Sequence, residues 1–107
     1  MGDFSKLIYL SEEFLSKDKL KKINSIKSKE EKKELLENSL ISELRLKHLD
    51  LEVKIKKIKE KKKKHILTLK SNIIPSKINL LRADFNEKDF KKIDSLIFKL
   101  TKEVEDV

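Results

Sequence analysis

The sequence predicts an all-α fold, and three observations support that prediction. Only one glycine and one proline interrupt the 107 residues, so long helices can continue without a break. Apolar residues recur at spacings of three and four along most of the chain, which is the period of an amphipathic helix. No segment keeps the strict alternation of a β-strand. We therefore expect a single helical domain over residues 1–107, built as an elongated helical bundle or a helical hairpin.

The composition predicts a thin hydrophobic core. Charged residues make up 43% of the chain and hydrophobic residues 37%, whereas globular domains average about 25% charged and about 45–50% apolar residues. A chain with this balance favours an elongated shape, or a core completed by a second chain.

The first segment, over residues 3–26, has a broken helical pattern and predicts one or two helices. Ser11 and Ser16 are the residues that could cap a restarted helix. The apolar stripe of this segment consists of Phe4, Leu7, Ile8, Leu10, Phe14, Leu15, Leu20 and Ile23.

A long helix is predicted over about residues 29–70. Ser28 and Glu31 form a capping box at its start, and no breaker follows before Asn72 and Pro75. Such a helix would be about 60 Å long.

The long helix carries a heptad-like apolar seam with three polar interruptions. The spacings of three and four are those of a coiled coil. A shorter stripe of Leu46, Leu49 and Val53 lies nearly opposite, so the middle of the helix requires cover on two sides. The predicted seam residues are Leu44, His48, Leu51, Ile55, Ile58, Lys62, His65 and Leu69.

Two shorter helices are predicted after the long one. The residue before Pro75 is driven out of the α region, and residues 76–83 can form a short helix. Asn86 is the predicted cap of a final helix over about 87–104, which would fold back antiparallel on the C-terminal half of the long helix. The final helix carries an apolar seam of Phe90, Ile93, Ile97, Leu100 and Val104.

The net charge of +8 lies entirely in one segment. Residues 1–53 hold 11 basic and 11 acidic side chains, and residues 71–107 hold 7 of each. Residues 54–70 hold nine lysines and one acid, Glu60. Like charges three or four residues apart on a helix destabilise it by roughly 0.2–0.5 kcal/mol per pair, so an anionic partner would stabilise this segment.

The charge map favours contact with the phosphate backbone of DNA or RNA. The segment contains no arginine to read guanine and no aromatic residue to stack on bases, which predicts low sequence specificity. The alternative is a solvated helix face, partly neutralised by acids of the final helix such as Glu103. The candidate nucleic-acid-binding residues are Lys54, Lys56, Lys57, Lys59, Lys61, Lys63 and Lys64.

The seam supports a second hypothesis, a coiled-coil structural or adapter protein that acts by helix–helix association without nucleic acid. Its polar members His48, Lys62 and His65 would then help to set register and partner number. This hypothesis predicts a homo-oligomer or a complex with another helical protein. A membrane-surface role is disfavoured, because the apolar face beside the lysines lacks Trp and Phe.

Catalysis, cofactors and metals are not expected. The chain has no cysteine, and His48 and His65 are 17 residues apart rather than at the i, i+4 spacing of a helical metal site. No glycine-rich phosphate loop is present, and no apolar run is long enough to span a bilayer. The first residues lack the apolar core of a signal peptide, so we expect a cytoplasmic protein, or a nuclear one in a eukaryote.

Overall fold

The computed structural model confirms the all-α prediction and describes residues 2–106, with side chains for residues 5–106. The chain, which the sequence predicts as one domain, divides into two compact units. Unit 1 spans Met1–Glu43 and unit 2 spans Leu44–Val107. The helices are α1 (Gly2–Phe14), α2 (Lys17–Asn24), α3 (Lys29–Lys56), α4 (Lys61–Ser71), α5 (Ile74–Ala83) and α6 (Glu87–Glu105).

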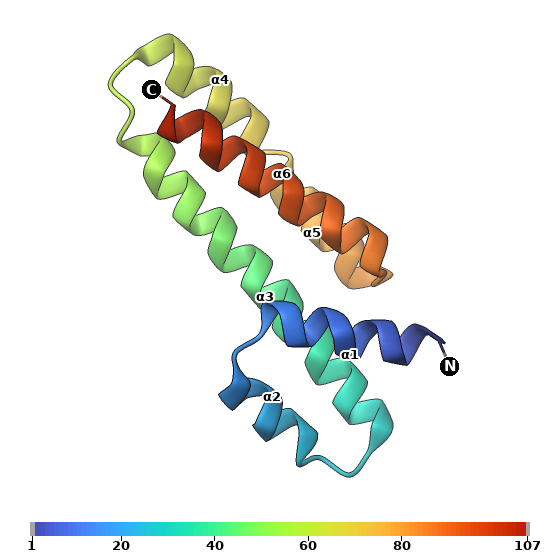
Figure 1. Ribbon diagram of the computed structural model, residues 1–107. Coiled ribbons are helices and arrows are strands. Elements are labelled where there is room, and N and C mark those ends of the chain that lie inside the picture. Colours follow the sequence, from blue (N-terminus) through green and yellow to red (C-terminus); the bar gives the residue numbers. More distant parts are fainter. Residues whose placement is uncertain (1, 107) are drawn as a thin grey trace. The chain divides into compact units, whose positions relative to one another are not determined.

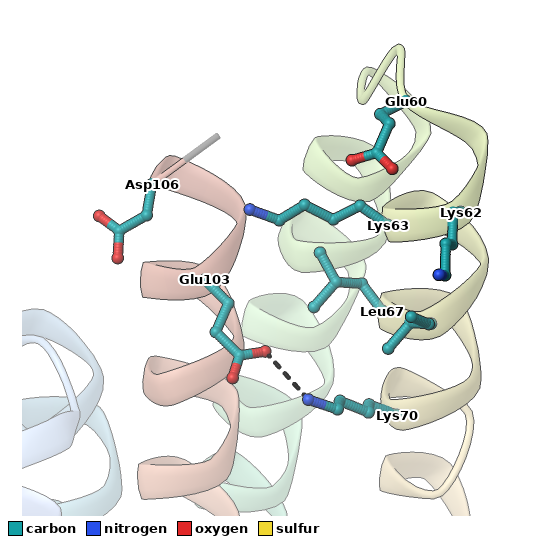
Figure 2. Close-up of a pocket in the computed structure, with 8 residues that line it drawn as sticks. Glu60, Lys62, Lys63, Leu67, Lys70, Glu103 and Asp106 are labelled. Atoms are coloured by element: carbon teal, nitrogen blue, oxygen red, sulfur yellow. Dashed lines mark hydrogen bonds and ion pairs between the residues drawn. The ribbon is translucent and has the colours of Figure 1, made fainter.

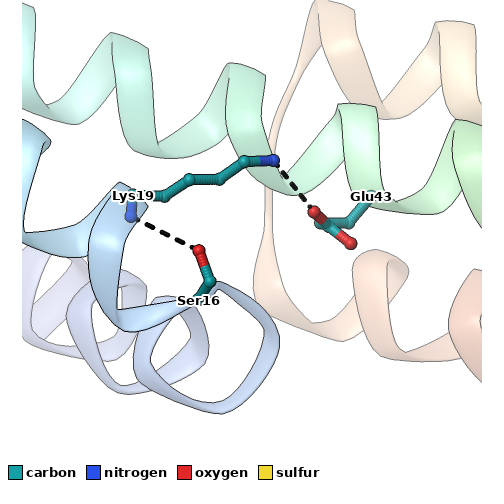
Figure 3. Close-up of polar contacts among 3 residues, drawn as sticks. All are labelled: Ser16, Lys19 and Glu43. Atoms are coloured by element: carbon teal, nitrogen blue, oxygen red, sulfur yellow. Dashed lines mark hydrogen bonds and ion pairs between the residues drawn. The ribbon is translucent and has the colours of Figure 1, made fainter.

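Unit 1 contains α1, α2 and the first part of α3, and local signals determine where its helices begin. Ser16 separates α1 from α2, and its Oγ accepts a hydrogen bond from the Lys19 N–H (3.3 Å). The Lys19 ammonium also reaches the Glu43 carboxylate at 3.1 Å (Figure 3). At the start of α3, the predicted cap Ser28 accepts from the Glu31 N–H at 3.4 Å. The core of unit 1 consists of Leu7, Leu10, Leu15, Ile23, Leu36, Leu40 and Ile41.

Phe4, which the sequence places at the start of the first apolar stripe, has a side chain outside the described residues.

Unit 2 is a bundle in which the chain runs along α3, returns through α4 and α5, and turns again into α6 (Figure 1). α6 packs against both α4 and α5. It is parallel to α3, because Lys47 pairs with Asp94 (2.6 Å) and Lys54 with Glu105 (3.8 Å). The core of unit 2 consists of Leu44, Leu51, Ile55, Ile58, Leu67, Ile74, Ile78, Leu81, Phe90, Ile93, Ile97 and Leu100.

The predicted helix over about 29–70 does not continue that far, because α3 ends at Lys56 and α4 begins at Lys61. The chain reverses direction between these two helices, which lets α4 and α5 bury an apolar face against α3 and α6. The free energy of this burial outweighs the high helix propensity of the lysines and glutamate in the turn. The final helix is therefore antiparallel to α4, as expected for residues 61–70, but parallel to the end of α3.

The predictions for the other elements of unit 2 differ from the structure only at their ends. Asn86 caps α6 by accepting a hydrogen bond from the Asp89 N–H at 2.8 Å. α5 begins at Ile74, two residues before the predicted start, because Pro75 is accommodated in the first turn of a helix. The expectation that the residue before Pro75 leaves the α region was therefore wrong, because Ile74 is the first residue of α5.

Candidate nucleic-acid interface

Seven lysines gather where α3 turns into α4. Because only four residues join the two helices, the hairpin brings the lysines at the end of α3 and those at the start of α4 to the same end of unit 2. We call this group the lysine tip. It consists of Lys56, Lys57, Lys59, Lys61, Lys62, Lys63 and Lys64.

The lysine tip is accessible and carries uncompensated charge. Lys63 and Lys64 are half-buried and the other five side chains are exposed. None of the seven forms an ion pair of 4.0 Å or less with a side chain in residues 5–106. The seven positive charges on these adjoining segments therefore have no fixed counter-charge among the described residues.

Two further lysines of the basic segment are neutralised within the unit. Lys54 lies 3.3 Å from the Asp50 carboxylate and 3.8 Å from that of Glu105. Lys70 lies 3.5 Å from the Glu103 carboxylate. The candidate Lys54 is thus less available to a ligand than the lysine tip, because the acidic end of α6 competes for it.

The first turn of α4 is basic, whereas the helix dipole favours acidic side chains at this position. A helix N-terminus carries about half a positive charge, which acidic side chains stabilise and cations destabilise. In α4, Lys61 to Lys64 occupy this turn, which contains no acid, and the N-cap residue Glu60 makes no capping hydrogen bond with its side chain. By contrast, α6 has Glu87 and Asp89 in its first turn. A phosphate bound here would remove part of this repulsion.

A hollow of about 510 Å³ lies beside the lysine tip, between α4 and α6 (Figure 2). Its apolar lining is Ile66 and Leu67. In Figure 2, Lys63 extends from α4 toward α6. Positive and negative side chains balance around the hollow, so the outward-facing lysines, rather than the hollow, are suited to a polyanion. The charged lining consists of Glu60, Lys62, Lys63, Lys70, Glu103 and Asp106.

The predicted helix seam divides at the turn. Its members on α3 and in the turn are buried: Leu44, His48, Leu51, Ile55 and Ile58. Lys62, His65 and Leu69 are exposed instead. α4 is a new helix that turns a different face, with Leu67 and Ser71, toward the core. The second predicted stripe, Leu46, Leu49 and Val53, is at least half exposed on α3.

His48 lies in the core of unit 2 with partners on both ring nitrogens. Its Nε2 is 3.0 Å from Ser71 Oγ and 3.2 Å from the Ser71 carbonyl oxygen. Its Nδ1 is 3.2 Å from the Glu52 carboxylate. The sequence of contacts from Ser71 through His48 to Glu52 is that of a hydrolase triad. Ser71 is only 2% exposed, however, so a substrate cannot reach its hydroxyl. The contacts hold the middle of α3 to the end of α4.

Replacing His48 tests this structural role. His48→Leu keeps most of the volume but leaves the buried Ser71 hydroxyl unpaired, which should lower the free energy of unfolding by about 1–3 kcal/mol. His48→Leu combined with Ser71→Ala removes both partners and should recover most of that loss. Urea unfolding followed by circular dichroism measures both. A double variant less stable than His48→Leu alone would contradict the proposed pairing.

Sequence reasoning missed the hydrogen-bond partner of His48 and one acidic partner of Lys54. Ser71 and Glu105 gave no local signal, because each pairs with a residue more than 20 positions away. Glu103 was among the acids considered, and the structure pairs it with Lys70.

Within the described residues, no group of three or more His, Asp or Glu side chains could hold a metal ion. Over the same residues, no helix combines the length and the apolar character required to cross a bilayer. Comparison with known proteins gives no assignment: no protein family matches the sequence, and no curated protein or solved structure matches it significantly.

Proposed function

We propose that this protein binds the phosphate backbone of DNA or RNA, with little sequence specificity, through the lysine tip. One observation carries the proposal. The whole net charge of +8 lies in residues 54–70, and seven of the nine lysines there form no ion pair with the described residues. Elsewhere in unit 2, Lys47 and Lys91 pair with acids of the same unit. The exposed α6 lysines Lys88, Lys92 and Lys99 are not in an ion pair among the described residues, but α6 holds as many acids as lysines.

The chemistry of the lysine tip supports backbone contact rather than base reading. A lysine ammonium binds phosphate as a point charge, whereas bidentate recognition of guanine favours arginine. The lysine tip contains neither arginine nor an aromatic side chain for stacking on unpaired bases. A duplex, with its high and regular density of phosphates, is therefore the expected ligand.

A salt titration tests the proposal directly. Binding of the full chain to a labelled DNA or RNA duplex should weaken steeply as salt rises from about 50 to 200 mM. If five to seven lysines each neutralise one phosphate, the log–log slope of the binding constant on a DNA duplex should be about −4.5 to −6.3. Fluorescence anisotropy gives the slope, and two unrelated duplex sequences should give the same affinity. A slope near zero, or no binding at low salt, would refute the proposal.

A further inference from the structure

An exposed apolar stripe follows the outer side of α4 and α5. Its four side chains keep large exposed fractions: Ile66 42%, Leu69 55%, Ile73 49% and Leu80 72%. Their spacings of three, four and seven place them on one helical face. The joint at Asn72 and Ile73 does not break this face, because both residues keep right-handed helical angles. We call these four residues the outer stripe, which is about 21 Å long.

The two edges of the outer stripe differ in charge. Along the edge next to α6, a lysine recurs every seven residues, at Lys63, Lys70 and Lys77. Of these, Lys70 is paired with Glu103 of α6, whereas Lys63 and Lys77 form no ion pair among the described residues. The other edge carries no acid and consists of His65, Asn72 and Asn79. A regular series of lysines beside an apolar stripe is the arrangement by which coiled coils select partners of opposite charge.

Hollows adjoin both ends of the outer stripe. The hollow between α4 and α6 includes Ile66 in its lining. A second one, of about 420 Å³, lies between α5 and α6 and has the apolar lining residues Leu80, Leu81, Ile93 and Leu96. These recesses can receive apolar side chains from a helix laid along the outer stripe, as in other helix-in-groove complexes.

A second copy of this chain does not suit the outer stripe. In an antiparallel pair, the lysine edge of one copy would face the lysine edge of the other. In a parallel pair, the lysines would face the histidine and asparagine edge, which offers no acid. We propose that the outer stripe docks an amphipathic helix of another protein, whose apolar seam is bordered by glutamate or aspartate. This inference does not depend on nucleic-acid binding.

Designed peptides provide the test. The probe is a labelled helical peptide of about three heptads with leucine at positions a and d and glutamate at e and g. A scrambled peptide of identical composition measures simple attraction to the lysine tip, and a version with lysine at e and g measures charge selection. The full chain should bind the acidic peptide at least about tenfold more tightly than either control. Equal binding of the acidic and scrambled peptides would overturn the proposal.

Matched variants locate the binding surface. Leu69→Ser with Leu80→Ser should weaken binding of the acidic peptide by about tenfold or more, because exposed apolar anchors are lost. Leu46→Ser with Leu49→Ser is the control, since these leucines are 56% and 55% exposed on α3 and should leave binding unchanged. An equal loss in both variants, or none in the first, would overturn the assignment of the surface.

Charge reversal tests the lysine edge. Reversing Lys63, Lys70 and Lys77 to glutamate should weaken binding of the acidic peptide and strengthen binding of the lysine peptide. Because Lys70 pairs with Glu103, this variant can lose stability, so Lys77→Glu alone serves as the second variant and should shift both affinities in the same directions. Unchanged affinities in Lys77→Glu, with folding verified by circular dichroism, would overturn the role of the edge.

Discussion

Reversing Lys61, Lys62 and Lys64 to glutamate should lower the affinity for a DNA duplex by about 100-fold or more at about 100 mM salt. Three phosphate contacts are lost, and three negative charges are placed against the backbone. The slope of the salt titration should fall by about 2.7, which is about 0.9 for each contact removed. Fluorescence anisotropy on the duplex used for the wild-type protein measures both quantities.

The same variant should fold at least as stably as the wild-type chain, which separates loss of binding from loss of structure. Acids in the first turn of a helix contribute about 0.3–1 kcal/mol each, and α4 has none. Lys62 and Lys63 both line the hollow that contains Glu103 and Asp106. Lys63 stays unchanged because it is the one that extends toward α6 (Figure 2), where a further acid would repel those carboxylates. The melting temperature of the variant should equal or exceed that of the wild type. A lower melting temperature would show that the first turn of α4 is not arranged as described.

A control with the same net charge distinguishes the lysine tip from general basicity. Reversing the exposed α6 lysines Lys88, Lys92 and Lys99 to glutamate also lowers the net charge from +8 to +2. It leaves the lysine tip intact, so most of the affinity and the salt slope should remain. If this control loses as much affinity as the first variant, the lysine tip is not the binding site.

The largest loss of stability is expected from Phe90→Ala. Phe90 on α6 is fully buried and packs against Phe85, with ring centroids 6.0 Å apart. Truncating a buried phenylalanine destabilises a protein by about 3–5 kcal/mol. Because small domains are stable by only about 5–15 kcal/mol, this variant should be close to unfolding at room temperature. Urea unfolding followed by circular dichroism measures the loss.

Phe98→Ala is the matched control, on the same helix and with the same atoms removed. Phe98 is 63% exposed, and its contact is with the Lys102 ammonium, 5.4 Å from the ring centroid. Losing an exposed cation–π contact costs about 0.5–1 kcal/mol. Equal losses in the two variants would contradict the burial assigned to α6.

The starts of α3 and α6 could be predicted because their causes are local. Ser28 and Asn86 were identified as caps from their own side chains and the acids that follow, and the structure shows both hydrogen bonds. The end of α3 had no such signal. Residues 57–60 contain no glycine, proline, asparagine or serine, and the reversal there depends on burial between α3 and segments more than 20 residues away. A prediction from sequence periodicity alone therefore placed the end of this helix too far along the chain, beyond Lys56.

The same distinction applies to the candidate interface. The concentration of lysines could be counted directly, because they are consecutive in the chain. Partial neutralisation of the basic segment by acids of the final helix was expected, with Glu103 among them. Which lysines are paired could not be predicted, because the pairing of Lys54 with Glu105 and of Lys70 with Glu103 depends on the arrangement of α6 beside α3 and α4. The exposure of Leu69 also escaped prediction, because the change in helix direction altered which face of α4 is buried.

The turn between α3 and α4 and the residues that flank it carry the lysine tip but contribute little to the hydrophobic core of unit 2. Between Ile55 and Leu67, Ile58 is the one buried side chain, so the lysines around it contribute almost nothing to the core. Mutation can therefore add, remove or replace charges here without refolding the bundle, provided that an apolar residue remains at position 58. The scaffold can therefore stay constant while the charges at this end change, which makes the turn a suitable place to graft a foreign recognition loop.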